Sequence, residues 1–179
     1  MAGGLGTRLG SMTEKTPKSL IEVNGKPILS HILDWAQAQG CLNALVLTGH
    51  LAEHFDGFTH SGMAVKFHRE PSPLGTGGAL WNAKEHLEER FILLWGDDLH
   101  PIDYAGLIET HQKGEAPMTM CATESHTEMN LRHQNGVLEA YDKTSTLEGL
   151  NGYEAGTSVV EKSVVMEHGK SGVWSWEQT

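Results

Sequence analysis

The sequence predicts a three-layer α/β fold with a mostly parallel sheet, and three observations support this prediction. Short runs of apolar and β-branched residues alternate along the chain with segments of helical periodicity. The 179 residues suffice for one domain with a large buried core. Hydrophobic residues make up 39% of the chain and charged residues 20%, which excludes a fibrous or disordered protein.

The chain up to about residue 123 supplies most of the predicted elements. Strands are predicted where β-branched and other apolar residues cluster, at 44–48, 64–68, 91–95 and 118–123. Helices are predicted before and between them, at 27–39, 77–89 and 103–113. Trp95, at the end of a strand, is expected to pack in the core.

The pattern changes from about residue 131 onward. Asn135-Gly136 indicates a hairpin turn between two short strand-like runs. Residues 148–156 are typical of a loop, and residues 157–160 of a further strand.

Both ends of the predicted domain are unfinished in this pattern. A glycine-rich turn follows Met1 directly, whereas a doubly wound sheet has a central strand leading into such a turn. Residues 175–179 complete no helix or strand. We therefore expect a single domain over 1–179 that lacks its first strand and a C-terminal segment, with Trp174 and Trp176 exposed near the second end.

The composition excludes several kinds of partner. The formal net charge is −10, which disfavours nucleic-acid binding because phosphate neutralisation needs clustered cations. No apolar run approaches the roughly 20 residues that span a bilayer, and the glycine-rich start shows no signal-peptide pattern, so we expect neither feature. Cys41 and Cys121 lie in apolar segments and are expected to be thiols in a reducing compartment. We therefore expect a cytoplasmic protein without membrane or nucleic-acid partners, and a homo-oligomer stays open.

The glycine-rich run at 2–9 (Ala-Gly-Gly-Leu-Gly-Thr-Arg-Leu) is the first candidate binding motif. Glycines let backbone amides approach phosphate oxygens, and Arg8 adds a fork of donors that matches a phosphate. A P-loop pattern is absent, and the glycine spacing does not fit a dinucleotide fingerprint. Lys18, in a proline-stiffened loop, would join Arg8 in neutralising a triphosphate or its leaving pyrophosphate. Taken alone, the run also fits a plain flexible turn.

Two later segments carry further candidate residues. A predicted strand ends in Gly96-Asp97, which places a carboxylate where open α/β folds bind ligands. One carboxylate there suits Mg²⁺, which also takes phosphate oxygens, and a helix cap or turn is the alternative role for Asp97. The proline- and glycine-rich loop at 70–79 has backbone groups suited to a base edge, and the helix after it favours anions at its N-terminus. Its alternative role is a plain connection with Thr76 as the helix cap.

Together these segments resemble the sugar-1-phosphate nucleotidyltransferase family. The family's pieces A-G-G-x-G-T-R-L, P-K-x-L, V-x-G-K-P, an L-G-T-x-G-A-type loop and G-D after a strand stand here in order, over about residues 1–160. The resemblance implies a Rossmann-like α/β/α nucleotidyltransferase domain. It also implies that a nucleoside triphosphate and a sugar 1-phosphate react, with Mg²⁺, to give an NDP-sugar and pyrophosphate. The sugar phosphate would attack the α-phosphorus in line, so no protein nucleophile is expected.

The resemblance also assigns roles to residues at the matching positions. The nucleotide-binding residues that it implies are Ala2, Gly3, Gly4, Gly6, Thr7, Glu70, Leu74, Gly75 and Thr76. Arg8 and Lys18 would act in catalysis through the phosphates, and Asp97 would hold Mg²⁺. The sugar-phosphate residues that it implies are Asp142, Lys143, Glu154 and Gly156, which lie in segments similar to the family's E-K-P and N-A-G pieces.

The chain departs from the family pattern at three of these positions. Asp142, Thr144 and Glu154 replace the usual Glu, Pro and Asn, so the resemblance does not fix the sugar. The family's second metal-binding Asp, in a W-x-D-x-G segment, has no counterpart here. The loop at 73–79 is most like that of heptose- or mannose-1-phosphate guanylyltransferases, which favours GTP. Two other functions stay open: a non-catalytic nucleotide-binding or regulatory domain, and a guanylyltransferase of the molybdenum-cofactor type.

Overall fold

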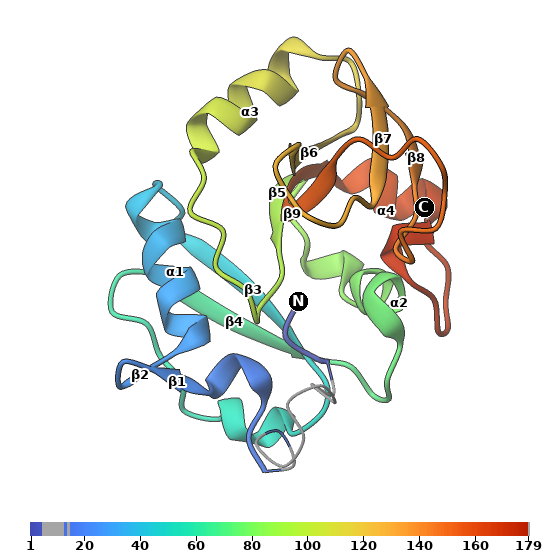
Figure 1. Cartoon of the computed structure of the whole chain (residues 1–179). Coiled ribbons are helices and arrows are strands. Elements are labelled where there is room, and N and C mark those ends of the chain that lie inside the picture. Colours follow the sequence, from blue (N-terminus) through green and yellow to red (C-terminus); the bar gives the residue numbers. More distant parts are fainter. Residues whose placement is uncertain (5–12, 14, 179) are drawn as a thin grey trace.

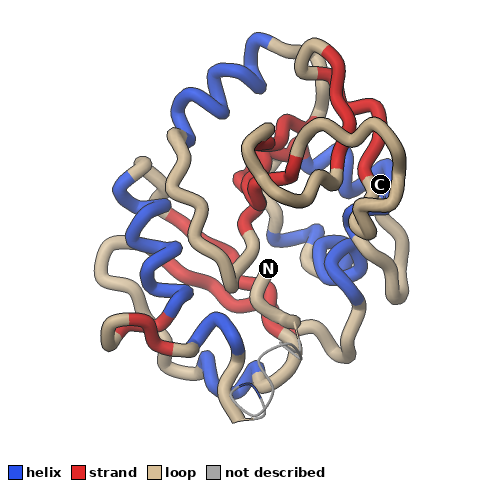
Figure 2. The backbone as a smooth tube through the Cα atoms, in the orientation of Figure 1, coloured by secondary structure: helices blue, strands red, loops and turns tan. Residues whose placement is uncertain are grey.

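The computed structural model describes residues 1–4, 13 and 15–178, which form a mixed α/β fold (Figure 1; Figure 2). The strands are β1 (Glu22–Val23), β2 (Lys26–Pro27), β3 (Asn43–Thr48), β4 (Ala64–Arg69), β5 (Arg90–Leu94), β6 (Met118–Thr123), β7 (Leu131–Gln134), β8 (Val137–Tyr141) and β9 (Tyr153–Glu161). The helices are α1 (Ile28–Ala38), α2 (Gly75–Asn82), α3 (Tyr104–Lys113) and α4 (Lys162–His168), with 3₁₀ turns at Lys18–Leu20, Ala52–Phe55, Lys84–His86 and Trp176–Gln178. Of the described helices, none is long and apolar enough to cross a bilayer.

The predicted elements are largely confirmed. The apolar runs at 44–48 and 91–95 form β3 and β5, and the three predicted helices are present, although α2 ends at Asn82 rather than near residue 89. Asn135 and Gly136 join β7 to β8 at φ values of 52° and 78°, as a two-residue hairpin turn requires. The prediction of a loop over 148–156 is wrong in part, because β9 begins at Tyr153. The sequence did not predict α4, which has only seven residues.

The arrangement of the strands corrects the prediction of a mostly parallel sheet. Among the described strands, β3 and β4 form a parallel pair in which Asn43 lies opposite Ala64. The strands β5 and β6 also share a direction, as a crossover through α3 requires, but β9 lies between them and is antiparallel to both. The other pairs, β1/β2 and β7/β8, are antiparallel hairpins. Alternation of strands and helices indicates which strands a helix joins, and it does not reveal a later strand inserted between them.

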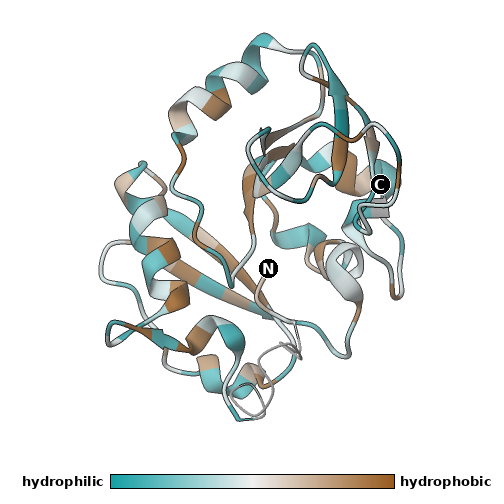
Figure 3. Cartoon of the chain, viewed as in Figure 1, coloured by the Kyte–Doolittle hydropathy of each residue, from teal (hydrophilic) through white to brown (hydrophobic). Residues whose placement is uncertain are grey.

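An apolar groove of about 570 Å³ lies between β3 and β5, which belong to different sheets. At one end of the groove, Ala2 N donates to Leu47 O on β3 at 2.8 Å. The Met1 amino group donates to Leu94 O on β5 at 3.0 Å, and Met1 O accepts from Gly96 N at 2.7 Å. The N-terminus therefore lies between the two strands (Figure 1). Hydrophobic residues of α1, β3 and β5 contribute to the lining. Figure 3 shows the hydropathy of the residues along these elements.

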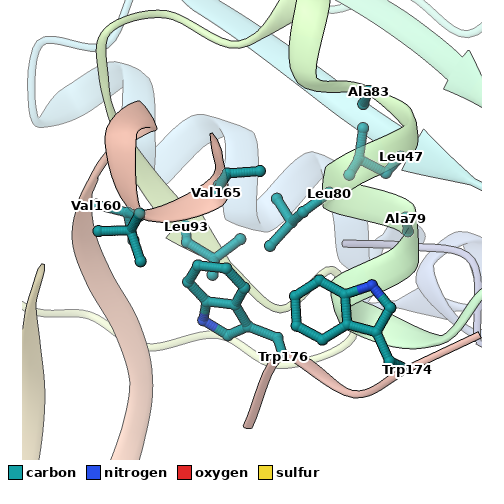
Figure 4. Packing of buried hydrophobic residues seen from close by; sticks show 10 residues of the cluster. Leu47, Ala79, Leu80, Ala83, Leu93, Val160, Val165, Trp174 and Trp176 are labelled. Carbon is teal, nitrogen blue, oxygen red and sulfur yellow. The ribbon is translucent and has the colours of Figure 1, made fainter. Parts of the chain in front are cut away.

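Two clusters of buried side chains hold the fold together. The first packs α1 against β3 and β4, with Leu29, Leu33, Ala36, Val46, Phe55, Met63 and Tyr104 as its buried members. The second joins α2 and α4 to β5 and β9, and it includes Trp174 and Trp176 (Figure 4). These indoles are only 7% and 5% exposed. The prediction that they are exposed is wrong, because large aromatic rings gain most by covering an apolar surface, here the α2 side of the core.

Candidate nucleotide cleft

A cleft of about 640 Å³ gathers many of the residues that the sequence singled out. Predicted site residues that line it are Ala2, Gly3, Gly4, Lys18, Glu70, Gly75, Thr76, Asp97 and Lys143. These residues come from five separate stretches of the chain. Gly6, Thr7 and Arg8 lie outside the described residues, so their roles stay predictions.

The start of the glycine-rich run packs closely against the loop after β4. A Cβ added at Gly3 would lie 3.0 Å from Glu70 Oε1 and 3.2 Å from Gly49 N. A Cβ added at Gly49 would lie only 2.1 Å from the same Glu70 oxygen. Both positions therefore require glycine for a close approach of backbone to carboxylate, in addition to any approach to a ligand.

The structure brings Lys18 and Asp97 into direct contact. Lys18 lies in the 3₁₀ turn after Pro17, and Asp97 follows β5 at the carboxyl edge of that strand. Their side chains form an ion pair, with Nζ 2.7 Å from Oδ2. Asp97 is thus a cleft residue, and the cap of α3 is Asp103, whose carboxylate accepts from Ala105 N at 3.0 Å.

Asp97 also fits a divalent cation site of limited strength. Mg²⁺ commonly takes one or two carboxylates and completes its shell with phosphate oxygens and water. Within the described residues no group of three or more His, Cys, Asp or Glu side chains could hold a metal. A cation at Asp97 would therefore depend on a phosphate ligand, and Lys18 would share the carboxylate with it.

The loop before α2 is shaped by Glu70 and by Gly75. Glu70 Oε2 accepts a hydrogen bond from Leu74 N at 3.1 Å, and burial raises the pKa of this carboxyl group. Gly75 has a φ of +72°, and a Cβ there would lie 2.5 Å from Trp174 O. Leu74 is not among the residues that line the cleft. Its backbone N donates to Glu70, and its backbone O accepts from Trp174 N at 3.0 Å.

The C-terminal segment closes the beginning of α2. Trp174 O accepts hydrogen bonds from Gly77 N at 3.1 Å and Gly78 N at 3.3 Å. The Thr76 hydroxyl accepts from Trp176 N at 2.8 Å. The prediction of an anion site at this helix N-terminus is therefore wrong for Gly77 and Gly78, because their backbone amides already donate hydrogen bonds to the Trp174 carbonyl. Thr76 lies inside α2 and is not its cap.

Lys143 reaches the cleft from a loop that Asp142 holds in shape. The Asp142 carboxylate accepts hydrogen bonds from the backbone N of Thr144, Thr146 and Leu147, at 2.9, 2.9 and 2.8 Å. The hydrogen bond from the Thr144 hydroxyl, together with these backbone bonds, lowers the pKa of Asp142. The structure thus gives Asp142 a loop-forming role, and its contact with a sugar hydroxyl stays a prediction.

Glu154 and Gly156 are not among the residues that line the cleft. Trp95 lines the cleft, which corrects its expected place in the core, and its indole Nε1 donates to Glu154 Oε1 at 3.4 Å. Burial raises the pKa of Glu154, with the Glu177 charge adding to the effect. Gly156 has a φ of +74°, and the His100 ring would clash with a Cβ there. Their contacts with a sugar stay predictions.

Sequence reasoning missed Glu177, whose side chain contacts two of the residues that line the cleft. Its carboxylate accepts from the Thr76 hydroxyl at 2.8 Å and from Lys143 Nζ at 2.9 Å. No motif spacing relates positions 76, 143 and 177, so the sequence offered no signal for this contact.

Phosphate groups match the chemistry of this cleft, because two lysines and a strand-end carboxylate converge where open α/β folds bind ligands. Fold and cleft together define an α/β protein with a candidate phosphate-binding cleft.

The family follows from comparison with known proteins. The family model described as "Nucleotidyl transferase" matches residues 1–162, and the chain belongs to this family. It is 32% identical over 124 residues to D-glycero-alpha-D-manno-heptose 1-phosphate guanylyltransferase of Aneurinibacillus thermoaerophilus, covering 67% of this chain and 54% of that protein. It is 28% identical over 128 residues to UTP–glucose-1-phosphate uridylyltransferase AglF of Haloferax volcanii, covering 69% and 52%. The chain spans about half the length of these relatives.

A solved structure of HddC from Yersinia pseudotuberculosis, complexed with GMP-PN, matches the fold. Its TM-score is 0.78 at 25% sequence identity, and the match covers 98% of this chain and 80% of that one.

Proposed function

We propose that the chain carries the active cleft of an enzyme that transfers a nucleotidyl group from a nucleoside triphosphate to a sugar 1-phosphate. The observation that supports this most is the convergence of Lys18, Asp97 and Lys143 on one cleft beside Gly3 and Gly4. The relatives named above act on sugar phosphates by their names. The products are an NDP-sugar and pyrophosphate.

In the proposed reaction, a phosphate oxygen of the sugar 1-phosphate attacks the α-phosphorus of the triphosphate. A bond forms between that oxygen and the α-phosphorus, the bond from the α-phosphorus to the bridging oxygen breaks, and the electron pair leaves with pyrophosphate. Lys143 holds the attacking phosphate, and Lys18 stabilises negative charge on the triphosphate. Arg8 is proposed to act beside Lys18. Catalysis then consists of positioning and charge stabilisation, and no side chain becomes covalently attached.

Mg²⁺ is the proposed cofactor, with Asp97 as its ligand from the protein. When bound, the ion supplies charge neutralisation on the phosphates. In its absence Lys18 holds the Asp97 carboxylate in place, which keeps an oxygen ligand ordered at the end of β5.

GTP is the proposed donor. Glu70 lines the cleft beside the loop before α2, and its carboxylate is an acceptor that suits the N2 amino donor of guanine. The similarity of the loop to guanylyltransferases and the GMP-PN complex of a similar protein support the same base. We also propose a cytoplasmic location, since Cys41 and Cys121 are free thiols.

The test is pyrophosphate release, measured with each of the four common nucleoside triphosphates against a panel of sugar 1-phosphates and a molybdenum-cofactor precursor. We expect release with GTP and mannose or heptose 1-phosphate, and dependence on Mg²⁺. Binding of labelled GTP without release from any pair would instead support a non-catalytic nucleotide-binding domain. Release only with a molybdenum-cofactor precursor as acceptor would support that alternative.

A further inference from the structure

Glu177 is a nearly buried carboxylate at the wall of the cleft, with an exposed fraction of 11% for its side chain. Three donors surround it. The Thr76 hydroxyl lies 2.8 Å from Oε2, the Lys143 ammonium lies 2.9 Å from Oε1, and the Ser175 hydroxyl also donates to Oε2. A loop of the proposed nucleotide site and the lysine of the proposed sugar-phosphate site thus meet on one side chain.

This carboxylate is charged at neutral pH. Burial by itself would raise the pKa of Glu177, but hydrogen bonds from Ser175 and Lys143 outweigh it and lower the pKa to about 2. An acceptor with full negative charge gives the stronger class of hydrogen bond to an ammonium.

Lys143 needs such a partner more than the other cleft lysine does. Its side chain is 68% exposed, against 31% for Lys18, and its four-carbon stem is flexible. The Asp142 bonds to the backbone of residues 144–147 fix the loop on which it stands, but they do not reach its ammonium. Glu177 is therefore the buried end of the pair and Lys143 the exposed one.

We propose that Glu177 is a positioning residue, which holds the Lys143 ammonium at the cleft and couples it to Thr76 in the first turn of α2. This inference rests on the proposed function. An ammonium has three donors, so one bond to Glu177 leaves two for a phosphate of the acceptor. The Lys143 side chain then loses its conformational entropy before the acceptor binds and not during binding, which is the advantage of a preorganised site.

A purely structural role is the competing explanation, and it predicts different effects. The backbone of Trp174 and Trp176 already closes the beginning of α2 without any carboxylate. If Glu177 served only that closure, its loss would weaken nucleotide and acceptor binding alike and would not depend on Lys143.

The experiment is a double-mutant cycle of Glu177→Gln and Lys143→Gln, read in steady-state pyrophosphate release. We expect Glu177→Gln to raise the acceptor KM about tenfold, with the KM for the nucleotide changed less than about twofold. In the Lys143→Gln background, Glu177→Gln should then have no further effect on acceptor KM. The exposed Glu167→Gln on α4 is the matched control and should change neither KM. Equal effects of Glu177→Gln in both backgrounds, or a lower acceptor KM, would overturn the proposal.

A second readout needs no turnover and separates this inference from the proposed function. Lys143 is acylated with acetic anhydride and quantified by peptide mass spectrometry, with and without mannose 1-phosphate. An ammonium held in an ion pair is less available, so Glu177→Gln should increase the labelling rate several-fold, and about tenfold more mannose 1-phosphate should be needed for protection. If no substrate pair releases pyrophosphate, the proposed function is wrong. The labelling rate of Lys143 then tests by itself whether Glu177 positions this lysine. An unchanged rate would then exclude positioning.

Discussion

Two hollows meet at Met1 and Ala2, and they differ in what lines them. The cleft is lined by charged side chains held in ion pairs: Lys18 with Asp97, and Lys143 with Glu177. The groove is lined mainly by apolar side chains, and it lies between the edge strands β3 and β5. Charges fixed in pairs suit a small anionic ligand, whereas apolar side chains between strand edges suit an extended polypeptide. Changes in the cleft are therefore expected to alter turnover, and changes in the groove to alter stability.

The largest expected effect is on the cleft side. Asp97→Asn should lower Mg²⁺-dependent turnover about 100-fold or more. The neutral amide binds the cation weakly and forms no ion pair with Lys18. The melting temperature of this variant should hardly change, since a half-exposed ion pair contributes little to stability. The matched control is Asp98→Asn, which alters the neighbouring exposed carboxylate. Normal turnover of Asp97→Asn would remove the metal ligand from the proposal.

The largest effect on the groove side should come from α1. Leu33 lines the groove with 4% of its surface exposed, and Leu33→Ala should lower the free energy of unfolding by about 2–4 kcal/mol. Leu42 also lines the groove but is 71% exposed, so Leu42→Ala should cost less than about 0.5 kcal/mol. Urea unfolding measures both variants. A loss of GTP turnover without loss of stability in Leu33→Ala would contradict the division between the two hollows.

The smallest effect concerns the glycines at the boundary of the hollows. Gly3→Ala would press a methyl group against Glu70 and Gly49, so a loss of about 1 kcal/mol in stability is expected. Gly4→Ala meets nothing within 4 Å and should leave the melting temperature nearly unchanged. Equal melting temperatures for the two variants would show that the close approach at Gly3 is relaxed in solution.

The comparison also separates what the sequence could predict from what it could not. Runs such as those at 44–48 and 91–95 are apolar enough to be recognised as strands, and Gly96-Asp97 follows one of them directly. The cleft was predictable as far as it depends on residues placed at strand ends and in glycine-rich turns.

Contacts between distant segments were not predictable in this way. The insertion of β9 between β5 and β6, and the ion pair of Lys143 with Glu177, depend on how late parts of the chain return to early ones. Trp174 and Trp176 show the same limit, because their burial depends on the surface of α2 and not on their own neighbours in sequence.

The bond between Thr76 and the segment that ends at Glu177 spans 101 positions. During synthesis, α2 and the loop before it leave the ribosome long before that segment does. The loop can therefore take its final shape only after residues 174–177 have been translated and have folded back. A nascent chain that stalls earlier would leave the amides of Gly77 and Gly78 open and the apolar side of α2 uncovered, and exposed apolar surface makes a partly folded chain prone to aggregation.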